Sequence, residues 1–150
     1  MRIVRDPRDV ALSLAGMPFA KDSVVGNLVR IDSDDRLSRE RIERDARAMT
    51  LRYEDLVTEP ERELRRVCEF IGEDYTDAML DTRSSYDQVN RLDEPWKHKV
   101  SGAIDKTRVA AWKGKLSEEE IRQSEILLGD RLQHYGYPCT IDCRQHAAVS

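Results

Sequence analysis

The stretch that most constrains this fold is residues 2–13, where a short apolar run passes directly into the start of a helix. The run ends at Arg5. Asp6 is then a good N-cap, Pro7 suits the first helical position, and an acidic residue follows in the first turn. The pattern predicts a strand that turns into a helix, with Ser13 about two turns along it.

The same stretch contains candidate ligands for a phosphate group. Arg5 at the strand end offers a planar fork of charged donors, and Ser13 on the helix offers a hydroxyl. The residues alone leave a second interpretation open, namely a well-capped helix with solvated charges, in which Ser13 is only a small helical residue.

Length and composition limit the class of protein. The chain has 150 residues, of which 39% are hydrophobic and 36% charged, and this predicts one domain. No apolar run approaches the roughly 18 residues of a membrane span, and no signal peptide is visible, so we expect a cytoplasmic protein with no membrane partner. A net charge of -4 argues against a nucleic-acid partner. Three cysteines predict reduced thiols, and their spacing fits no metal site.

Several segments between these landmarks have weaker signals. Residues 16–36, with Gly, Asp and Ser, predict a loop, in which residues 24–29 form either a short helix or an edge strand. Residues 37–48 are charge-dense and predict a surface helix. Residues 50–53 predict a short strand, and residues 75–83 a short helix.

Two helices have clear start and stop signals. A capping box at residues 58–61 begins a helix that ends at Gly72. A second box at residues 117–120 begins a helix that ends at Gly136. Residues 84–104 lack periodicity and predict a long functional loop.

Several segments carry a family resemblance, and two of them lie within residues 3–57. Residues 3–13, Ile-Val-Arg-Asp-Pro-Arg-Asp-Val-Ala-Leu-Ser, resemble the 3′-phosphate-binding segment of sulfotransferases that use 3′-phosphoadenosine 5′-phosphosulfate (PAPS), above all bacterial-type members. This implies that Arg5 and Ser13 bind the 3′-phosphate. Residues 51–57, Leu-Arg-Tyr-Glu-Asp-Leu-Val, resemble the stretch in which a tyrosine at a strand end approaches the adenine. This implies an adenine contact for Tyr53, whereas the residue alone favours a core aromatic with a satisfied hydroxyl.

A third segment is similar to the part of the family that closes over the 3′-phosphate shortly before a tryptophan. It comprises residues 105–112, Asp-Lys-Thr-Arg-Val-Ala-Ala-Trp. The resemblance implies three further phosphate ligands, Lys106, Thr107 and Arg108. It departs from an Arg-Lys-Gly pattern, because Asp105 and Thr107 stand where arginine and glycine would fall. An exposed basic turn is the alternative.

The resemblance implies a fold and a reaction. The fold is α/β, a P-loop NTPase-like doubly wound parallel sheet with a helix-rich remainder, over residues 1–138, followed by a weakly ordered tail over residues 139–150. The reaction transfers a sulfuryl group from PAPS to a hydroxyl or amine of a small-molecule or glycan acceptor.

One part of the family pattern is absent from the sequence. No Gly-rich Lys-Ser/Thr loop, which grips the 5′-phosphosulfate, occurs in it, and no catalytic base is identified. We therefore expect an incomplete domain that lacks the N-terminal strand-loop-helix, retains the 3′-phosphate and adenine half, and is weak or inactive alone. The alternative is a non-catalytic nucleotide-binding or oligomer-forming remnant, stable as a homo-oligomer.

Overall fold

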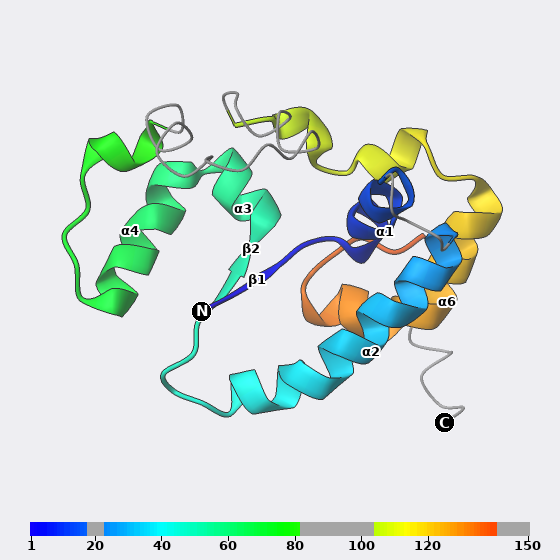
Figure 1. The fold of residues 1–150 in the computed structure, drawn as a ribbon, viewed down its shortest axis with the longest axis horizontal. Coiled ribbons are helices and arrows are strands. Elements are labelled where there is room, and N and C mark those ends of the chain that lie inside the picture. Colours follow the sequence, from blue (N-terminus) through cyan, green and yellow to red (C-terminus); the bar gives the residue numbers. More distant parts are fainter. Residues whose placement is uncertain (18–22, 82–103, 141–150) are drawn as a thin grey trace. The chain divides into compact units, whose positions relative to one another are not determined.

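Residues 1–17, 23–81 and 104–140 are described by the computed structural model (Figure 1). They belong to two units. The first consists of Met1–Val4 and Met49–Val109, and the second of Arg5–Ala48 and Ala110–Ser150. No helix among the described residues is both long enough and apolar enough to cross a membrane.

A two-stranded parallel sheet begins the first unit. Strand β1 (Arg2–Val4) pairs with β2 (Thr50–Arg52), and Ile3 lies opposite Leu51. Val4 is 2% exposed and its neighbour Ile3 is 53% exposed, because successive side chains of a strand point to opposite faces. Leu51 of β2 is also 2% exposed. Both predicted strands are confirmed, and their pairing is parallel, as expected for a parallel sheet. Among the described residues the sheet has two strands, and the doubly wound sheet that the resemblance implies stays a prediction.

Two helices follow β2 without a loop. Helix α3 (Tyr53–Thr58) begins at Tyr53, so the strand ends one residue earlier than predicted. Helix α4 (Pro60–Ile71) comes next, with proline in its first turn as predicted. The predicted capping box at residues 58–61 is wrong, because Thr58 still belongs to α3 and its hydroxyl donates to the Glu54 carbonyl at 2.8 Å.

The end of α4 is as predicted. Gly72 adopts the left-handed conformation, with φ of 76°, and its N–H donates back into the last turn. The short helix predicted over residues 75–83 is a single 3-10 turn, η1 (Asp77–Leu80). A second 3-10 turn of this unit is η3 (Lys106–Arg108). The long loop predicted over residues 84–104 lies almost wholly outside the described residues.

The second unit begins with α1 (Pro7–Ala15), which Asp6 caps as predicted. Helix α2 (Val24–Glu43) follows. It confirms the helical alternative for residues 24–29 and the helix predicted from residue 37, which ends at Glu43 instead of residue 48. The loop predicted over residues 30–36 is wrong. The Ser23 side chain accepts the Gly26 N–H at 3.2 Å and caps this helix. Its buried positions are mostly polar, and for that reason no apolar period marks it. They are Asn27, Leu28 and Asp35.

Helix α6 (Glu118–His134) packs against α2 in this unit (Figure 1). Its predicted capping box is confirmed, since Ser117 and Glu120 bind each other's backbone N–H groups. Leu128 and Leu132 are fully buried on its apolar face. A 3-10 turn, η4 (Ala111–Gly114), lies against α1.

Candidate functional site

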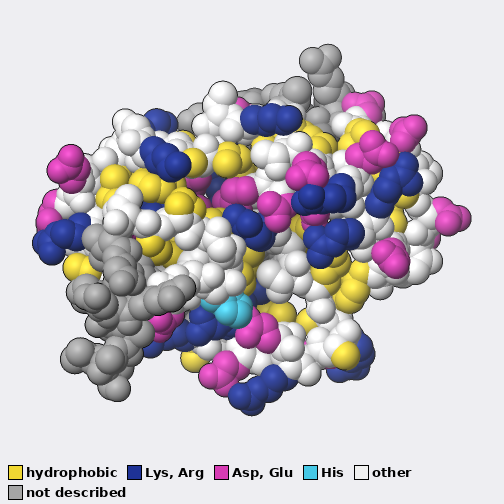
Figure 2. Space-filling model, turned by 180° about the vertical axis from the view of Figure 1, so that it is seen from behind, with side chains coloured by type: hydrophobic (Ala, Val, Ile, Leu, Met, Phe, Trp, Pro, Cys, Tyr) yellow, Lys and Arg dark blue, Asp and Glu magenta, His cyan; other side chains and the backbone are white. Residues whose placement is uncertain are grey.

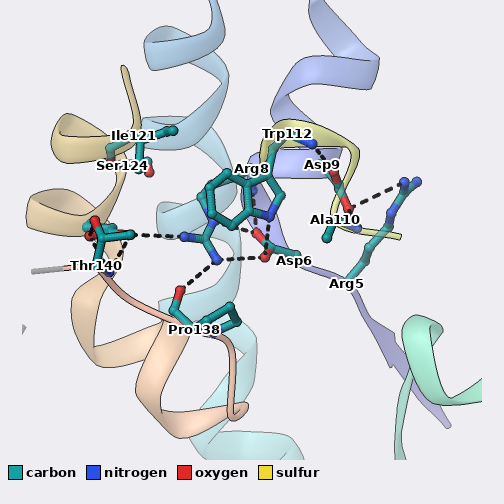
Figure 3. A network of polar contacts seen from close by, with 11 residues as sticks. Arg5, Asp6, Arg8, Asp9, Ala110, Trp112, Ile121, Ser124, Pro138 and Thr140 are labelled. Carbon is teal, nitrogen blue, oxygen red and sulfur yellow. Dashed lines mark hydrogen bonds and ion pairs between the residues drawn. The ribbon is translucent and has the colours of Figure 1, made fainter. Parts of the chain in front are cut away.

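A buried arginine organises the part of the second unit around the start of α1. Arg8 is fully buried, and its guanidinium binds the Asp6 carboxylate twice, with Nε 3.0 Å from Oδ1 and Nη2 2.7 Å from Oδ2. Nη1 donates to Glu125 Oε1 at 3.2 Å, and Nη2 donates to the Pro138 carbonyl at 2.9 Å (Figure 3). One side chain therefore joins α1, α6 and the segment after α6.

The indole of Trp112 packs onto this arginine. The Arg8 guanidinium carbon lies 3.8 Å from the ring centroid, which is a cation–π contact. The indole Nε1–H donates to Asp6 Oδ2 at 3.1 Å. Trp112 is almost completely buried. The indole therefore packs against the start of α1.

A second carboxylate holds the same turn by its backbone. Asp9 is 2% exposed, and its two oxygens accept the N–H groups of Ala110 and Trp112, each at 2.9 Å. Arg5 Nη2 lies 3.9 Å from Asp9 Oδ2. Burial raises the pKa of Asp9, and the Trp112 N–H and the charge of Arg5 oppose that rise.

These contacts test one part of the second interpretation of residues 2–13. The helix is capped by Asp6, but Asp6, Arg8 and Asp9 are all buried, so the expectation that its charges are solvated is wrong. The Arg5 side chain is 21% exposed, and Ser13 is half-buried. Asp9 and Ser13 are four residues apart on α1 and therefore share one face of it. Arg5 forms an ion pair with Asp9 on that face. The phosphate role of Arg5 and Ser13 stays a prediction.

The other predicted ligands belong to the first unit. Tyr53 is half-buried at the first position of α3. Asp105 caps the η3 turn: its carboxylate accepts the Thr107 N–H at 3.0 Å and the Thr107 hydroxyl, and it pairs with Arg108 at 3.1 Å. Lys106 is exposed. Two of the three predicted donors of this turn are therefore bound to the acidic residue that departs from the family pattern.

The surface offers no broad basic field on the face that Figure 2 shows, where Lys, Arg, Asp and Glu side chains are interspersed. Exposed arginines pair along their own helices, as in Arg65 with Glu61 and Arg122 with Glu119, both at 2.9 Å. Affinity for a phosphate would therefore come from particular side chains rather than from net charge.

Sequence reasoning missed the partners that close the network. Glu125 lies on the apolar face of α6, four residues after Ile121 and three before Leu128, and a carboxylate at that position signals a buried partner. Its oxygens accept the N–H and the hydroxyl of Thr140, at 2.9 and 2.8 Å. Thr140 falls in the predicted tail of residues 139–150, of which 141–150 lie outside the described residues.

Comparison with known proteins gives one family and two relatives. Residues 2–77 match the model of the "Sulfotransferase family". The chain is 35% identical over 109 residues to carbohydrate sulfotransferase 7 of Mus musculus, and 36% identical over the same length to that of Rattus norvegicus. Each match covers 69% of this chain and 21% of the relative, so the matched region spans about a fifth of the relatives' length. No solved structure matches.

Proposed function

The chain belongs to the sulfotransferase family, and on that premise we propose that it binds the 3′-phosphate and adenine of PAPS and takes part in transfer of the sulfuryl group. The observation that carries the proposal is the family match over residues 2–77. This region includes β1, the start of α1 and β2, and with them Arg5, Ser13 and Tyr53.

We assign Arg5 and Ser13 to the 3′-phosphate. A partly exposed guanidinium at a strand end can form charge-assisted hydrogen bonds to phosphate oxygens, which are about twice as strong as neutral ones. The half-buried hydroxyl of Ser13 adds a short-range donor. Tyr53 is assigned to the adenine, and Lys106, Thr107 and Arg108 to further phosphate contacts, on the family resemblance.

We propose a carbohydrate hydroxyl as the acceptor. The support is the likeness to two proteins named carbohydrate sulfotransferase. Group transfer of this kind depends on positioning and on charge stabilisation at the transferred group. The residues assigned here hold the nucleotide end of the donor, and the sequence has no Gly-rich Lys loop for the end that reacts.

Nucleotide binding is tested by titrating adenosine 3′,5′-bisphosphate into the 150-residue chain in a calorimeter. Arg5→Ala should weaken binding about tenfold or more, the value of one charge-assisted contact. The matched control is Arg122→Ala, which removes the same charge from an exposed ion pair of the same unit and should bind unchanged. Equal affinities of the parent chain and Arg5→Ala would remove the phosphate assignment.

Catalysis is tested separately with labelled PAPS and a panel of oligosaccharides. We expect little or no turnover from this chain alone, because the sequence has no loop for the 5′-phosphosulfate. Sulfation of an oligosaccharide would show that other residues grip the reacting end. Nucleotide binding without turnover, together with self-association in sedimentation, would favour the non-catalytic remnant instead.

A further inference from the structure

Asp9 binds across the second unit instead of capping its own helix. Asp6 already caps α1, and Asp9 lies three residues later. An acidic side chain at that position often reaches back to the N-cap backbone. Here both oxygens instead accept N–H groups from residues that lie 101 and 103 positions further along the chain.

These two hydrogen bonds fix the carboxylate in a single orientation. Each oxygen has its own N–H donor at 2.9 Å, and the side chain has no exposed surface. The donors come from a turn that is itself immobilised, because the Trp112 indole is buried against Arg8 and bonded to Asp6. The buried Trp112 side chain therefore fixes the position of its own backbone N–H, and that N–H in turn fixes Asp9.

Arg5 is the last residue in this series of contacts. Its Nη2 lies 3.9 Å from the same Oδ2 that accepts the Ala110 N–H. The Arg5 side chain is partly exposed, whereas Trp112 and Asp9 are buried. A long arginine side chain loses rotamer freedom when it is fixed, so a neighbour that already restricts it improves its affinity for a ligand.

We propose that Asp9 is a positioning residue for nucleotide binding, which orients the Arg5 guanidinium toward the 3′-phosphate from a carboxylate that the backbone of Ala110 and Trp112 holds in place. This inference rests on the proposed function, because it concerns how Arg5 performs the role assigned there. Asp9 itself does not touch the nucleotide. Its negative charge is stabilised by the N–H groups of Ala110 and Trp112 and by the Arg5 guanidinium.

The test is a double-mutant cycle on the affinity for adenosine 3′,5′-bisphosphate. Asp9→Asn keeps the size of the side chain but removes its charge and one acceptor. We expect it to weaken binding about fivefold to tenfold, and the double variant Arg5→Ala/Asp9→Asn to bind within about twofold of Arg5→Ala. If Asp9 only stabilised the fold, its substitution would weaken binding by the same factor whether or not Arg5 is present.

Gly72→Ala serves as the control for lost stability. It strains a helix end of the other unit, and it should bind the bisphosphate as the parent chain does. If Gly72→Ala lowers affinity as much as Asp9→Asn, the loss reflects stability and the positioning role is overturned. Circular dichroism confirms that each variant is folded at the titration temperature.

The remaining outcomes separate this inference from the proposed function. If Arg5→Ala weakens binding and Asp9→Asn does not, the function stands and the positioning role fails. If the effects of the two substitutions multiply, Asp9 acts independently of Arg5 and the inference is again overturned. If the parent chain does not bind the bisphosphate, the proposed function fails and the inference fails with it.

Discussion

At the scale of single residues, the second unit depends on charges that water does not reach. The Arg8 guanidinium is surrounded by two carboxylates, a carbonyl and the face of an indole, and these groups stabilise its charge in the absence of water. Burying a paired charge adds little net stability, but removing one partner leaves the other uncompensated. The energetic consequence of a substitution here is therefore much larger than that of breaking a surface pair.

Arg8→Met tests this directly. Methionine fills similar space but leaves Asp6 and Glu125 buried without the guanidinium, and we expect a loss of about 3–5 kcal/mol in the free energy of unfolding. Urea denaturation measures it. Arg122→Met, which breaks an exposed pair with Glu119, should cost less than about 1 kcal/mol. Similar losses in the two variants would contradict the view that the network is desolvated.

Asp9 gives a pH dependence with a definite sign. Burial raises its pKa in the folded state above the ordinary value of 3.8. The folded chain therefore retains this proton at a pH where the unfolded chain has released it, and the contribution of Asp9 to stability falls as pH rises from about 4 through the raised pKa. The stability of the parent chain relative to Asp9→Asn should decline over that interval and then level off. Urea midpoints measured from pH 4 to 7 test this. The control is Gly72→Ala, which changes no titratable group, so its stability difference from the parent chain should be the same at every pH.

At the scale of elements, helix ends are where local sequence acts most clearly. Ser117 and Glu120 form a reciprocal cap at the start of α6, and Gly72 closes α4 in a conformation that side chains disfavour. Both ends were predictable, because each depends on residues within a few positions of one another.

Gly72→Ala should destabilise the chain by about 1 kcal/mol. A Cβ at Gly72 would meet no atom within 4 Å, so the cost arises from the backbone conformation alone. Gly114→Ala is the matched control, since a Cβ there also meets open space and no positive φ is involved. Equal thermal midpoints for the two variants would mean that the left-handed turn is not populated.

Ser117→Ala should cost about 1 kcal/mol, the usual value for an N-cap hydroxyl. The Glu120 carboxylate, which accepts the Ser117 N–H at 2.9 Å, would keep half of the box. Ser33→Ala on α2 removes an exposed hydroxyl that binds only its own helix, at Val29, and should be nearly neutral. Guanidinium denaturation of both variants compares them, and a larger loss for Ser33→Ala would reverse the assignment.

The elements that sequence reasoning missed share a physical cause. Helix α2 buries Asn27 and Asp35 beside Leu28, so its inward face looks polar and its start, with Ser23 and Gly26, looks like a turn. The strand–helix start at residues 2–13 was predictable from capping chemistry, but the partners of Arg8 were not. They lie 117 and 130 positions away, and no local pattern encodes a contact at that distance.

At the scale of the whole molecule, the second unit is closed by residues near its C-terminal end. One oxygen of Glu125 accepts a hydrogen bond from Arg8, and both of its oxygens accept the Thr140 N–H. A chain that stops after Pro138 loses the Thr140 donors and leaves a buried carboxylate partly unsatisfied, so it should be about 1–3 kcal/mol less stable than one that stops after Thr140. Thermal melts of the two truncated chains compare them. Equal melting temperatures would mean that Arg8 alone satisfies Glu125.

The buried network also sets the order in which the chain can mature during its synthesis. Arg8 is made well before its partners, because Glu125 and Pro138 follow it 117 and 130 positions later. Until the ribosome has released that distant stretch, the guanidinium stays hydrated and the α1 helix lacks the surface that buries it. Contacts of such long sequence separation form slowly, and unfinished states expose apolar groups. The nascent second unit is thus most vulnerable to misassembly just before its last described residues emerge.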